Sequence, residues 1–395
     1  MSRSPGQLAF RRFVRNRAAL AGTVVIALGI FLALFAYFII PDPGSNANTQ
    51  IVELKLKKPG FEIRLLKIPA GSEESVPLMK RLRSGIPVRG RYIPILDYEI
   101  ANGQLRYTHY TGNDSSGIAE SIPLATLLSP GARGTVHPGG GLTLRLKDGR
   151  EKVLSSEEVK KAVEARIRTK RFLLGTDALG RDYFSRLILG ARVSLTVGFM
   201  AVLISLLIGL VLGSVAGYYR SWPDEVIMYF INIFWSIPTL LLALSLSLVF
   251  SRGLSQVYMA IGLTMWVEVA RMVRGQFIGL RETEYIEAAR SLGFRSFRTI
   301  FRHMLPNVTG PVIVVVASNF AAAILLEAGL SFLGLGVDRP TPSWGAMLSD
   351  NRNFLIAGLP HLAILPGLAI SLFVLSFFLI GNGLRDAFDV RDNRK

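Results

Sequence analysis

The stretch EYIEAARSLGFRSFRTIFRHMLPN, Glu284–Asn307, decides how this chain is organised, because it separates two long apolar blocks and is itself amphipathic. Its first half repeats apolar residues at i, i+3, i+4 and i+7, as one face of a helix does. These residues are Tyr285, Ala288, Ala289 and Leu292. Its second half repeats Phe294, Phe297 and Phe301. Short amphipathic helices outside a bilayer need a cover for their apolar faces, and either lipid or a groove in a partner protein can supply it.

Six apolar blocks flank this stretch, each of ~17–25 residues, the length that a bilayer core requires. They lie at about residues 18–40, 193–218, 226–250, 257–273, 311–333 and 361–384. The first exceeds the ~7–15 apolar residues of a cleaved signal peptide, so we interpret it as a permanent helix. Pro238 interrupts the third block and Pro366 lies early in the sixth. Spanning helices tolerate proline where neighbours satisfy the freed carbonyl groups.

Composition restricts the possible functions. Half of the 395 residues are hydrophobic and none is cysteine, which excludes disulfides, Cys-ligated zinc and thiol nucleophiles. The formal net charge is +17, with the basic residues beside apolar blocks rather than in one polar domain. This placement favours membrane lipids as partners over nucleic acid. The basic N-terminus, the basic Glu284–Asn307 stretch and the basic tail at 385–395 predict that both termini are cytoplasmic.

Residues 41–170 differ from the rest, because long apolar runs stop and Pro, Gly and charge intervene. Alternation at 51–57 and 142–147 predicts strands, and Asp148-Gly149 predicts a turn. A capping box at Ser155 predicts a helix to about residue 170, and 112–117 and 130–141 are expected to be loops. The predicted fold class is an all-α polytopic membrane protein with six transmembrane helices and a small, mostly-β extracytoplasmic insert. We divide it into 1–40, an insert at 41–170, a five-helix core at 171–384 with a cytoplasmic loop at 275–309, and a tail at 385–395.

The string EAARSLG, followed by Leu-Pro after a fixed gap, resembles the coupling-loop signature of bacterial ABC importer permeases. The matching residues are Glu287, Ala288, Ala289, Gly293, Leu305 and Pro306. Further strings resemble C-type permeases of dipeptide, oligopeptide and nickel importers. They are LGTDALGRD at 174–182, GARVSL at 190–195, LEAGLSFLGLG at 326–336 and PSWGAM at 342–347. The resemblance covers residues 1–40 loosely and about 172–390 closely, and the insert has no matching counterpart.

The resemblance implies a type I ABC importer permease in the bacterial inner membrane that carries peptides, or alternatively nickel or another small solute. It implies a homologous second permease chain, two ATP-binding subunits and an extracytoplasmic solute-binding protein. This chain would hold no cofactor, since ATP and Mg would be bound by the partners, and it lacks the GxxxxGK[ST], HExxH and GxSxG motifs. We expect Glu287 to contact the ATPase rim, small Ala288 and Ala289 to let the helix sit deep, and Gly293 to set the bend. A secondary transporter would show inverted repeats, which are not evident here.

Ionisable residues at membrane depth are candidate functional sites. Glu268 and Arg271 are three apart and could pair on one helix face, with a structural ion pair favoured over a substrate site. Glu327 is expected either to line the pore or to bond a neighbouring helix. Three residues just before the second block are candidates for an outer gate, with a structural role favoured. They are Asp177, Arg181 and Asp182. No histidine spacing predicts a metal site, and His303 is interpreted as an interface or cap residue.

Overall fold

The computed structural model describes residues 5–71, 76–87, 90–112, 117–137, 141–146, 150–251 and 253–388. The chain forms two compact units. Unit 1 comprises Met1–Leu34 and Leu189–Lys395, and unit 2 comprises Phe35–Ile188. Three sequence expectations lie wholly or mostly outside the described residues, namely the loop at 112–117, the Asp148-Gly149 turn and the tail beyond residue 388.

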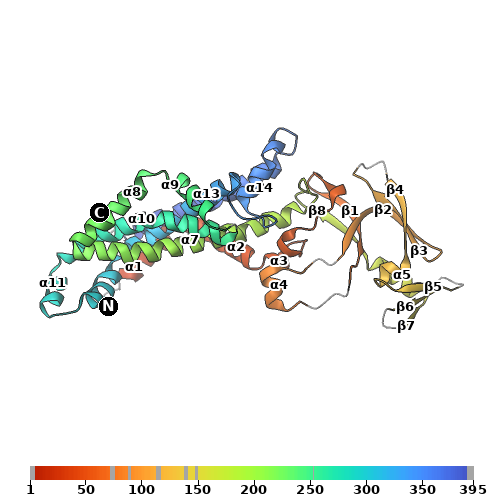
Figure 1. Cartoon of the computed structure of the whole chain (residues 1–395), viewed down its shortest axis with the longest axis horizontal. Helices are drawn as coiled ribbons and strands as arrows, with labels where there is room; N and C mark the ends of the chain where they lie inside the picture. The colour runs from red at the N-terminus through yellow and green to blue at the C-terminus, as the bar shows by residue number, and fades with distance from the viewer. Residues whose placement is uncertain are drawn as a thin grey trace. The chain divides into compact units, whose positions relative to one another are not determined.

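Unit 1 is helical (Figure 1). Its α7 begins within the last residues of unit 2. Apart from the segments that join α10 to α13, its helices are α1 (Pro5–Arg15), α2 (Arg17–Leu34), α7 (Tyr183–Tyr219), α8 (Trp222–Ser236), α9 (Thr239–Val249), α10 (Leu254–Arg281), α13 (Thr309–Phe332), α14 (Trp344–Asn351), η5 (Arg352–Leu355) and α15 (His361–Phe388).

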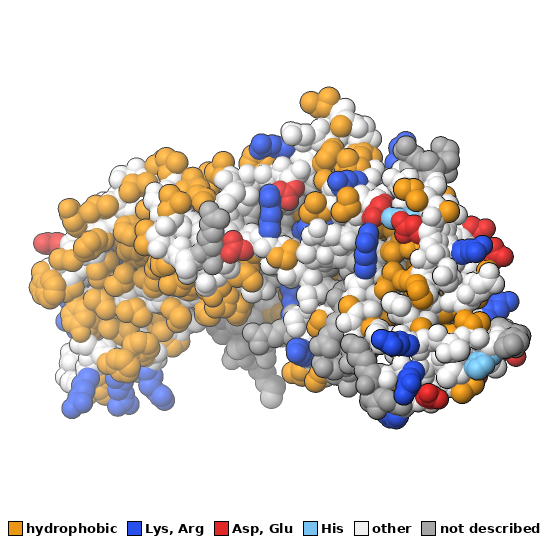
Figure 2. Space-filling model, turned by 45° about the vertical axis from the view of Figure 1, so that its right-hand side comes forward, with side chains coloured by type: hydrophobic (Ala, Val, Ile, Leu, Met, Phe, Trp, Pro, Cys, Tyr) orange, Lys and Arg blue, Asp and Glu red, His pale blue; other side chains and the backbone are white. Residues whose placement is uncertain are grey.

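The apolar helices of unit 1 are suited to a membrane. In the described residues, four helical segments are long and apolar enough to span it: Arg17–Ile39, Tyr183–Tyr219, Ser296–Phe332 and His361–Phe388. Helices α8 and α9 form a fifth such segment if counted together, although they bend by 99° at their junction. The junction is Ile237-Pro238, where proline cannot continue a helix. Figure 2 shows hydrophobic side chains over most of the visible surface of unit 1 and a charge-mixed surface on unit 2.

Helices α7 and α10 pack closely through a line of glycines on α7. A methyl group at Gly209, Gly213 or Gly217 would lie 2.5 Å from an atom of α10. Small residues at such spacing let helices approach within the membrane, where no hydrophobic driving force holds them together. The three glycines therefore serve the close packing of α7 on α10.

Unit 2 contains two antiparallel sheets. The larger has the order β4-β3-β2-β1-β8 and the smaller has the order β5-β6-β7. The strands are β1 (Phe61–Ile68), β2 (Arg91–Ala101), β3 (Gln104–Tyr110), β4 (Gly117–Pro123), β5 (Arg133–Val136), β6 (Leu142–Arg145), β7 (Glu151–Leu154) and β8 (Ile167–Phe172). The short helices are α3 (Ala36–Ile39), η1 (Ser45–Ala47), η2 (Val52–Leu54), α4 (Leu78–Ser84), α5 (Leu124–Leu128) and α6 (Ser156–Glu164). A shared core joins the sheets to α5 and α6.

Several expectations for this unit are confirmed and others are wrong. The strand expected from residue 142 and the Ser155 capping box are present. The strand expected at 51–57 is instead the turn η2, because Ile51 and Leu54, three residues apart, both point into the core. The helix expected to reach residue 170 ends at Glu164, since 167–172 pairs with β1 as strand β8. The loop expected at 130–141 contains β5.

Candidate functional site

The segment between α10 and α13 forms a compact bent unit. It comprises α11 (Glu284–Ser291), α12 (Ser296–Arg298), the π-helical turn η3 (Thr299–Met304) and the 3-10 turn η4 (Leu305–Val308). At the end of α11 the Gly293 amide donates to the Arg290 carbonyl at 2.9 Å, and the Phe294 amide donates to Ala289 at 3.1 Å. This pair of bonds is a Schellman motif, which needs a left-handed residue at its turn. Gly293 supplies it with a φ of +76°.

The inner face of this segment joins it to the helical bundle. Ile286 of α11 is buried in one cluster with Ile300, Met304 and Val308. The same cluster includes Val273 and Phe277 of α10. The inner face of the segment is therefore packed on α10.

The outer face is apolar and exposed. Tyr285 is 46% exposed, Leu292 75%, Phe297 71% and Phe301 50%. Exposed charged residues border them: Glu287, Arg290, Arg295, Arg298 and Arg302. An apolar patch with a charged rim is the anatomy of a protein interface.

The two alanines of the EAA string face opposite ways. Ala288 is exposed on the outer face, whereas Ala289 is 6% exposed on the inner face. The expectation that both enter a partner's groove is therefore wrong for Ala289, because the Ile286 side of α11 packs on the bundle. Pro306 is exposed and Leu305 packs partly against the inner cluster.

His303 packs and hydrogen-bonds within the bent segment itself. Its ring stacks on Phe294 with centroids 5.6 Å apart, and its carbonyl accepts a hydrogen bond from Asn307 at 2.7 Å. In the part of the chain that the structure describes, no group of three His, Asp or Glu side chains could hold a metal ion.

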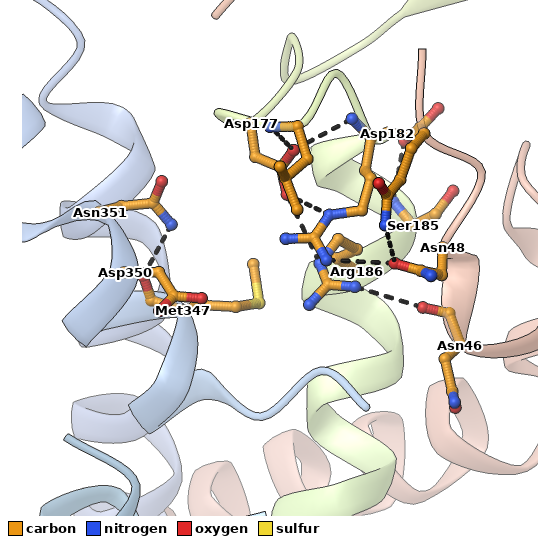
Figure 3. Close-up of polar contacts among 12 residues, drawn as sticks. Asn46, Asn48, Asp177, Asp182, Ser185, Arg186, Met347, Asp350 and Asn351 are labelled. Atoms are coloured by element: carbon orange, nitrogen blue, oxygen red, sulfur yellow. Dashed lines mark hydrogen bonds and ion pairs between the residues drawn. The ribbon is translucent and has the colours of Figure 1, made fainter. Parts of the chain in front are cut away.

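The three gate candidates belong to a buried polar network inside unit 2 (Figure 3). The Asp177 carboxylate accepts hydrogen bonds from the Arg181 amide at 3.0 Å and its guanidinium at 2.7 Å. Asp182 accepts from the Ser185 amide at 3.0 Å in the first turn of α7, and Lys170 lies 3.2 Å from its second oxygen. These bonds fix the chain at the start of α7.

The same network ties residues 42–49 to the start of α7. Arg181 donates to the Asn48 side chain at 3.2 Å, and Arg186 donates to the Asn46 carbonyl at 3.4 Å. The Asp42 amide donates to Ser185 at 3.1 Å. Asn46, Asn48 and Asp42 were missed by sequence reasoning, because more than 130 residues separate them from their partners.

The intramembrane candidates lie in three different environments. Glu268 is exposed on α10 and makes no pair with Arg271, whose guanidinium lies 3.5 Å from the ring centre of Trp235. The expected Glu268–Arg271 pair is therefore wrong, since Arg271 stacks on the indole of α8 instead. Glu327 is fully buried and accepts hydrogen bonds from Ser331 at 2.8 Å and from Ser194 of α7 at 3.2 Å. The Ser331 partner was predictable from the sequence, because residues four apart on a helix lie on the same face. Nothing in the sequence points to Ser194 as the second partner.

Comparison with known proteins agrees with this architecture. A family described as the binding-protein-dependent transport system inner membrane component matches residues 209–392. A second, described as the N-terminal TM domain of oligopeptide transport permease C, matches residues 4–59. The chain is 43% identical over 216 residues to the glutathione transport system permease protein GsiD of Pectobacterium atrosepticum, covering 55% of this chain and 71% of that protein. It is 45% identical over 215 residues to the dipeptide transport system permease protein DppC of Alkalihalophilus pseudofirmus, covering 54% and 70%.

Solved structures are similar over about half of the chain. An inward-facing MetNI methionine ABC transporter aligns with a TM-score of 0.40 and 18% identity, covering 50% of this chain and 96% of that chain. An amino acid ABC transporter with histidines aligns with a TM-score of 0.37 and 18% identity, covering 52% and 92%.

The helical bundle and the bent loop packed on it define a membrane permease subunit of an ABC transporter. The chain belongs to the family of binding-protein-dependent transport system inner membrane components, and within it to the C-type branch. The resemblance noted from the EAA string is thereby confirmed. Unit 1 has the type I importer permease fold of that family, and unit 2 is a β-rich insert.

Proposed function

We propose that this chain forms half of the pore of an ATP-driven importer of short peptides and transmits force from ATPase subunits through the segment 275–309. The peptide class is carried over from the glutathione, dipeptide and oligopeptide systems to which its relatives belong. A homologous second permease chain completes the pore, and two ATP-binding subunits hold ATP and Mg. One observation carries the coupling role: the loop is apolar on both faces, with one face packed on α10 and the other exposed.

The membrane arrangement follows from counting α8 and α9 as one broken span and α10 as another, which gives six spans. Helix α10 is less apolar than the others because Gln256, Glu268 and Arg271 lie in it. The short basic segments support a cytoplasmic position for both termini and the loop, and an outside position for unit 2. There unit 2 would receive the solute-binding protein, with the network at Asp177 holding its base in position.

Within this proposal Gly293 sets the angle between α11 and the following turns. Gly293→Pro should uncouple ATP hydrolysis from peptide uptake, because proline fixes φ near −65° where the loop requires +76°. Gly293→Asn is the matched control, since asparagine tolerates the left-handed region. A methyl group at Gly293 would have no atom within 4 Å, so any effect of substitution arises from the backbone. Glu287→Lys should uncouple as well, by reversing a charge at the exposed rim.

The experiment is reconstitution of this chain with the second permease, the ATPases and the binding protein in proteoliposomes. Uptake of a radiolabelled dipeptide and ATP hydrolysis are measured together. If Gly293→Pro and Glu287→Lys both transport at the wild-type rate, the coupling assignment is wrong. Failure of the chain to co-purify with any ATPase would refute the whole proposal.

A further inference from the structure

Helix α10 has an exposed face without any apolar side chain. Every residue from 256 to 281 is described, and the exposed ones among them are Glu268, Gly275, Gln276 and Gly279. Three of these, Glu268, Gly275 and Gly279, follow one another at intervals of seven and four residues, so they lie on one face of the helix. A methyl group added at either glycine would meet nothing within 4 Å, so the space beside this face is open.

The exposed surface of a neighbouring span has the opposite character. On α15 the exposed side chains include Leu368, Leu372, Leu375 and Phe378, at 46% to 59% exposure, as contact with lipid requires. Glu268 stands midway along α10, about 20 Å from either end at ~1.5 Å per residue. A carboxylate at that depth of a span is costly in lipid and is found facing a bundle interior or a water-filled cavity. The exposed face of α10 therefore fits an aqueous path rather than lipid.

A second charge borders the same face. Arg271 follows Glu268 by about one turn, and its guanidinium stacks on the ring of Trp235 of α8, which is 63% exposed. Because Arg271 stacks on the indole, the carboxylate and the guanidinium stand side by side without pairing. Residues three apart on a helix have Cβ atoms about 5–6 Å apart. An extended dipeptide spans at most about 7 Å, so one such molecule can reach both charges.

We propose that this face of α10 lines the path of the transported peptide, with Glu268 binding the protonated amino terminus and Arg271 attracting the carboxylate end. The inference rests on the proposed function, in which α10 is a span of the pore. A zwitterionic peptide loses hydration as it crosses the membrane, and side chains of opposite charge along the path offset part of that cost. Gly275 and Gly279 leave room beside the path for peptide side chains of different size.

The first experiment asks whether water reaches this face. The chain has no cysteine, so Glu268→Cys and Leu372→Cys each introduce a single thiol. The assembled transporter, in proteoliposomes with and without ATP, is treated with a cationic, water-soluble methanethiosulfonate, and modification of this chain is followed by its mass. We expect Glu268→Cys to be modified and Leu372→Cys to stay unmodified, because the reactive thiolate is disfavoured in apolar surroundings.

The second experiment tests the charge of the carboxylate. In the same vesicles, with saturating binding protein, the maximal rate of uptake of radiolabelled dialanine is measured. Glu225→Gln is the control, since it removes an exposed carboxylate in the first turn of α8. We expect Glu268→Gln to lower the rate about fivefold, the factor that one partly exposed ion pair supplies. Glu268→Asp should stay close to the wild-type rate and the control should equal it, whereas a merely structural Glu268 would tolerate the isosteric glutamine.

Three outcomes overturn the inference and leave the proposed function standing, provided that the wild-type complex takes up dialanine. Glu268→Cys as unreactive as Leu372→Cys would assign this face to lipid. Modification in the isolated chain but not in the assembled transporter, with or without ATP, would assign it to the second permease chain. Uptake by Glu268→Gln at the wild-type rate would show that the carboxylate binds no ammonium group. If the wild-type complex takes up no dipeptide, the proposed function fails instead.

Discussion

Replacing Gly213 with alanine adds one methyl group where α7 and α10 are in close contact. The methyl carbon would lie 2.5 Å from the Ala270 carbonyl oxygen and 2.9 Å from the Val273 β-carbon. Ordinary van der Waals contact begins at 3.4 Å. Since the nearest atom is backbone, it cannot rotate away, and the two helices must separate.

The expected change in the free energy of unfolding is the balance of two opposing effects. Overpacking of a tight interface costs about 1–3 kcal/mol. Against this, alanine in a helix is favoured over glycine by roughly 0.5–1 kcal/mol. The difference of the two ranges is roughly 0–2.5 kcal/mol, so Gly213→Ala should destabilise the protein by about 1 kcal/mol, a factor of about 5 in the folded-to-unfolded ratio.

Gly275→Ala is the control, because Gly275 lies within α10 and its added methyl group meets nothing within 4 Å. The same chemical change there should be neutral or stabilising by up to about 1 kcal/mol. The assay is the free energy of unfolding of the purified chain in mixed detergent micelles, measured by titration with a denaturing detergent. A lower free energy of unfolding for Gly213→Ala together with an equal or higher one for Gly275→Ala would support close packing of α7 on α10. Gly213→Ala at or above wild-type stability would show that α7 and α10 are not in close contact.

Two further outcomes concern buried and half-buried polar groups. Glu327→Gln should keep most of the stability in the same assay, whereas Glu327→Leu should lose about 1–3 kcal/mol by leaving two serine hydroxyls without an acceptor; equal losses would contradict this. In unit 2 the Tyr107 hydroxyl donates a hydrogen bond to the Glu120 carboxylate at 2.8 Å. This hydrogen bond is the main cause that lowers the pKa of Glu120. Burial is the main cause that raises the pKa of Tyr107 to about 12. A carboxyl group whose pKa is lower in the folded state than in the unfolded state stabilises the fold at pH values above its unfolded pKa. This stabilisation is lost as the pH falls through the pKa of the folded state. Tyr107→Phe should therefore lower the midpoint of thermal unfolding at neutral pH, with the difference from wild type shrinking below about pH 4.5; a difference that is constant with pH would refute it.

The helical blocks were predictable because the length of an apolar run is a direct physical requirement of a bilayer. The ends of the helices were less predictable than the blocks themselves. Helix α7 begins at Tyr183, ten residues before the apolar block, because the Asp182 side chain caps its first turn. The break between α8 and α9 occurs beside Pro238, the residue that the sequence singled out. A bend of 99°, however, depends on packing that the local sequence does not encode.

The insert was harder to predict, because its strands form through partners distant in sequence. The β2–β3 hairpin has a strong local signal that was overlooked: Asn102-Gly103 adopts left-handed φ values of 51° and 73°. Such a pair between apolar runs is typical of a two-residue hairpin turn. Strand β8 had no such signal, since its identity comes from pairing with β1 about one hundred residues earlier.

In the segment between α10 and α13, the sequence predicted the bend at Gly293, but the predicted apolar face of α11 was only partly right, because Ala289 faces the bundle while Tyr285, Ala288 and Leu292 are exposed. Ile286 lay outside the predicted apolar set, yet it is fully buried, whereas Leu292 is mostly exposed. Burial here is decided by contact with α10, which periodicity within the loop cannot reveal. The consequence is mechanical: with Ile286 and Ala289 holding the loop to the bundle, the outward Leu292 and Phe297 remain available for a partner. In the proposed function, a push on that outer face moves α10 and, with it, the closely packed α7.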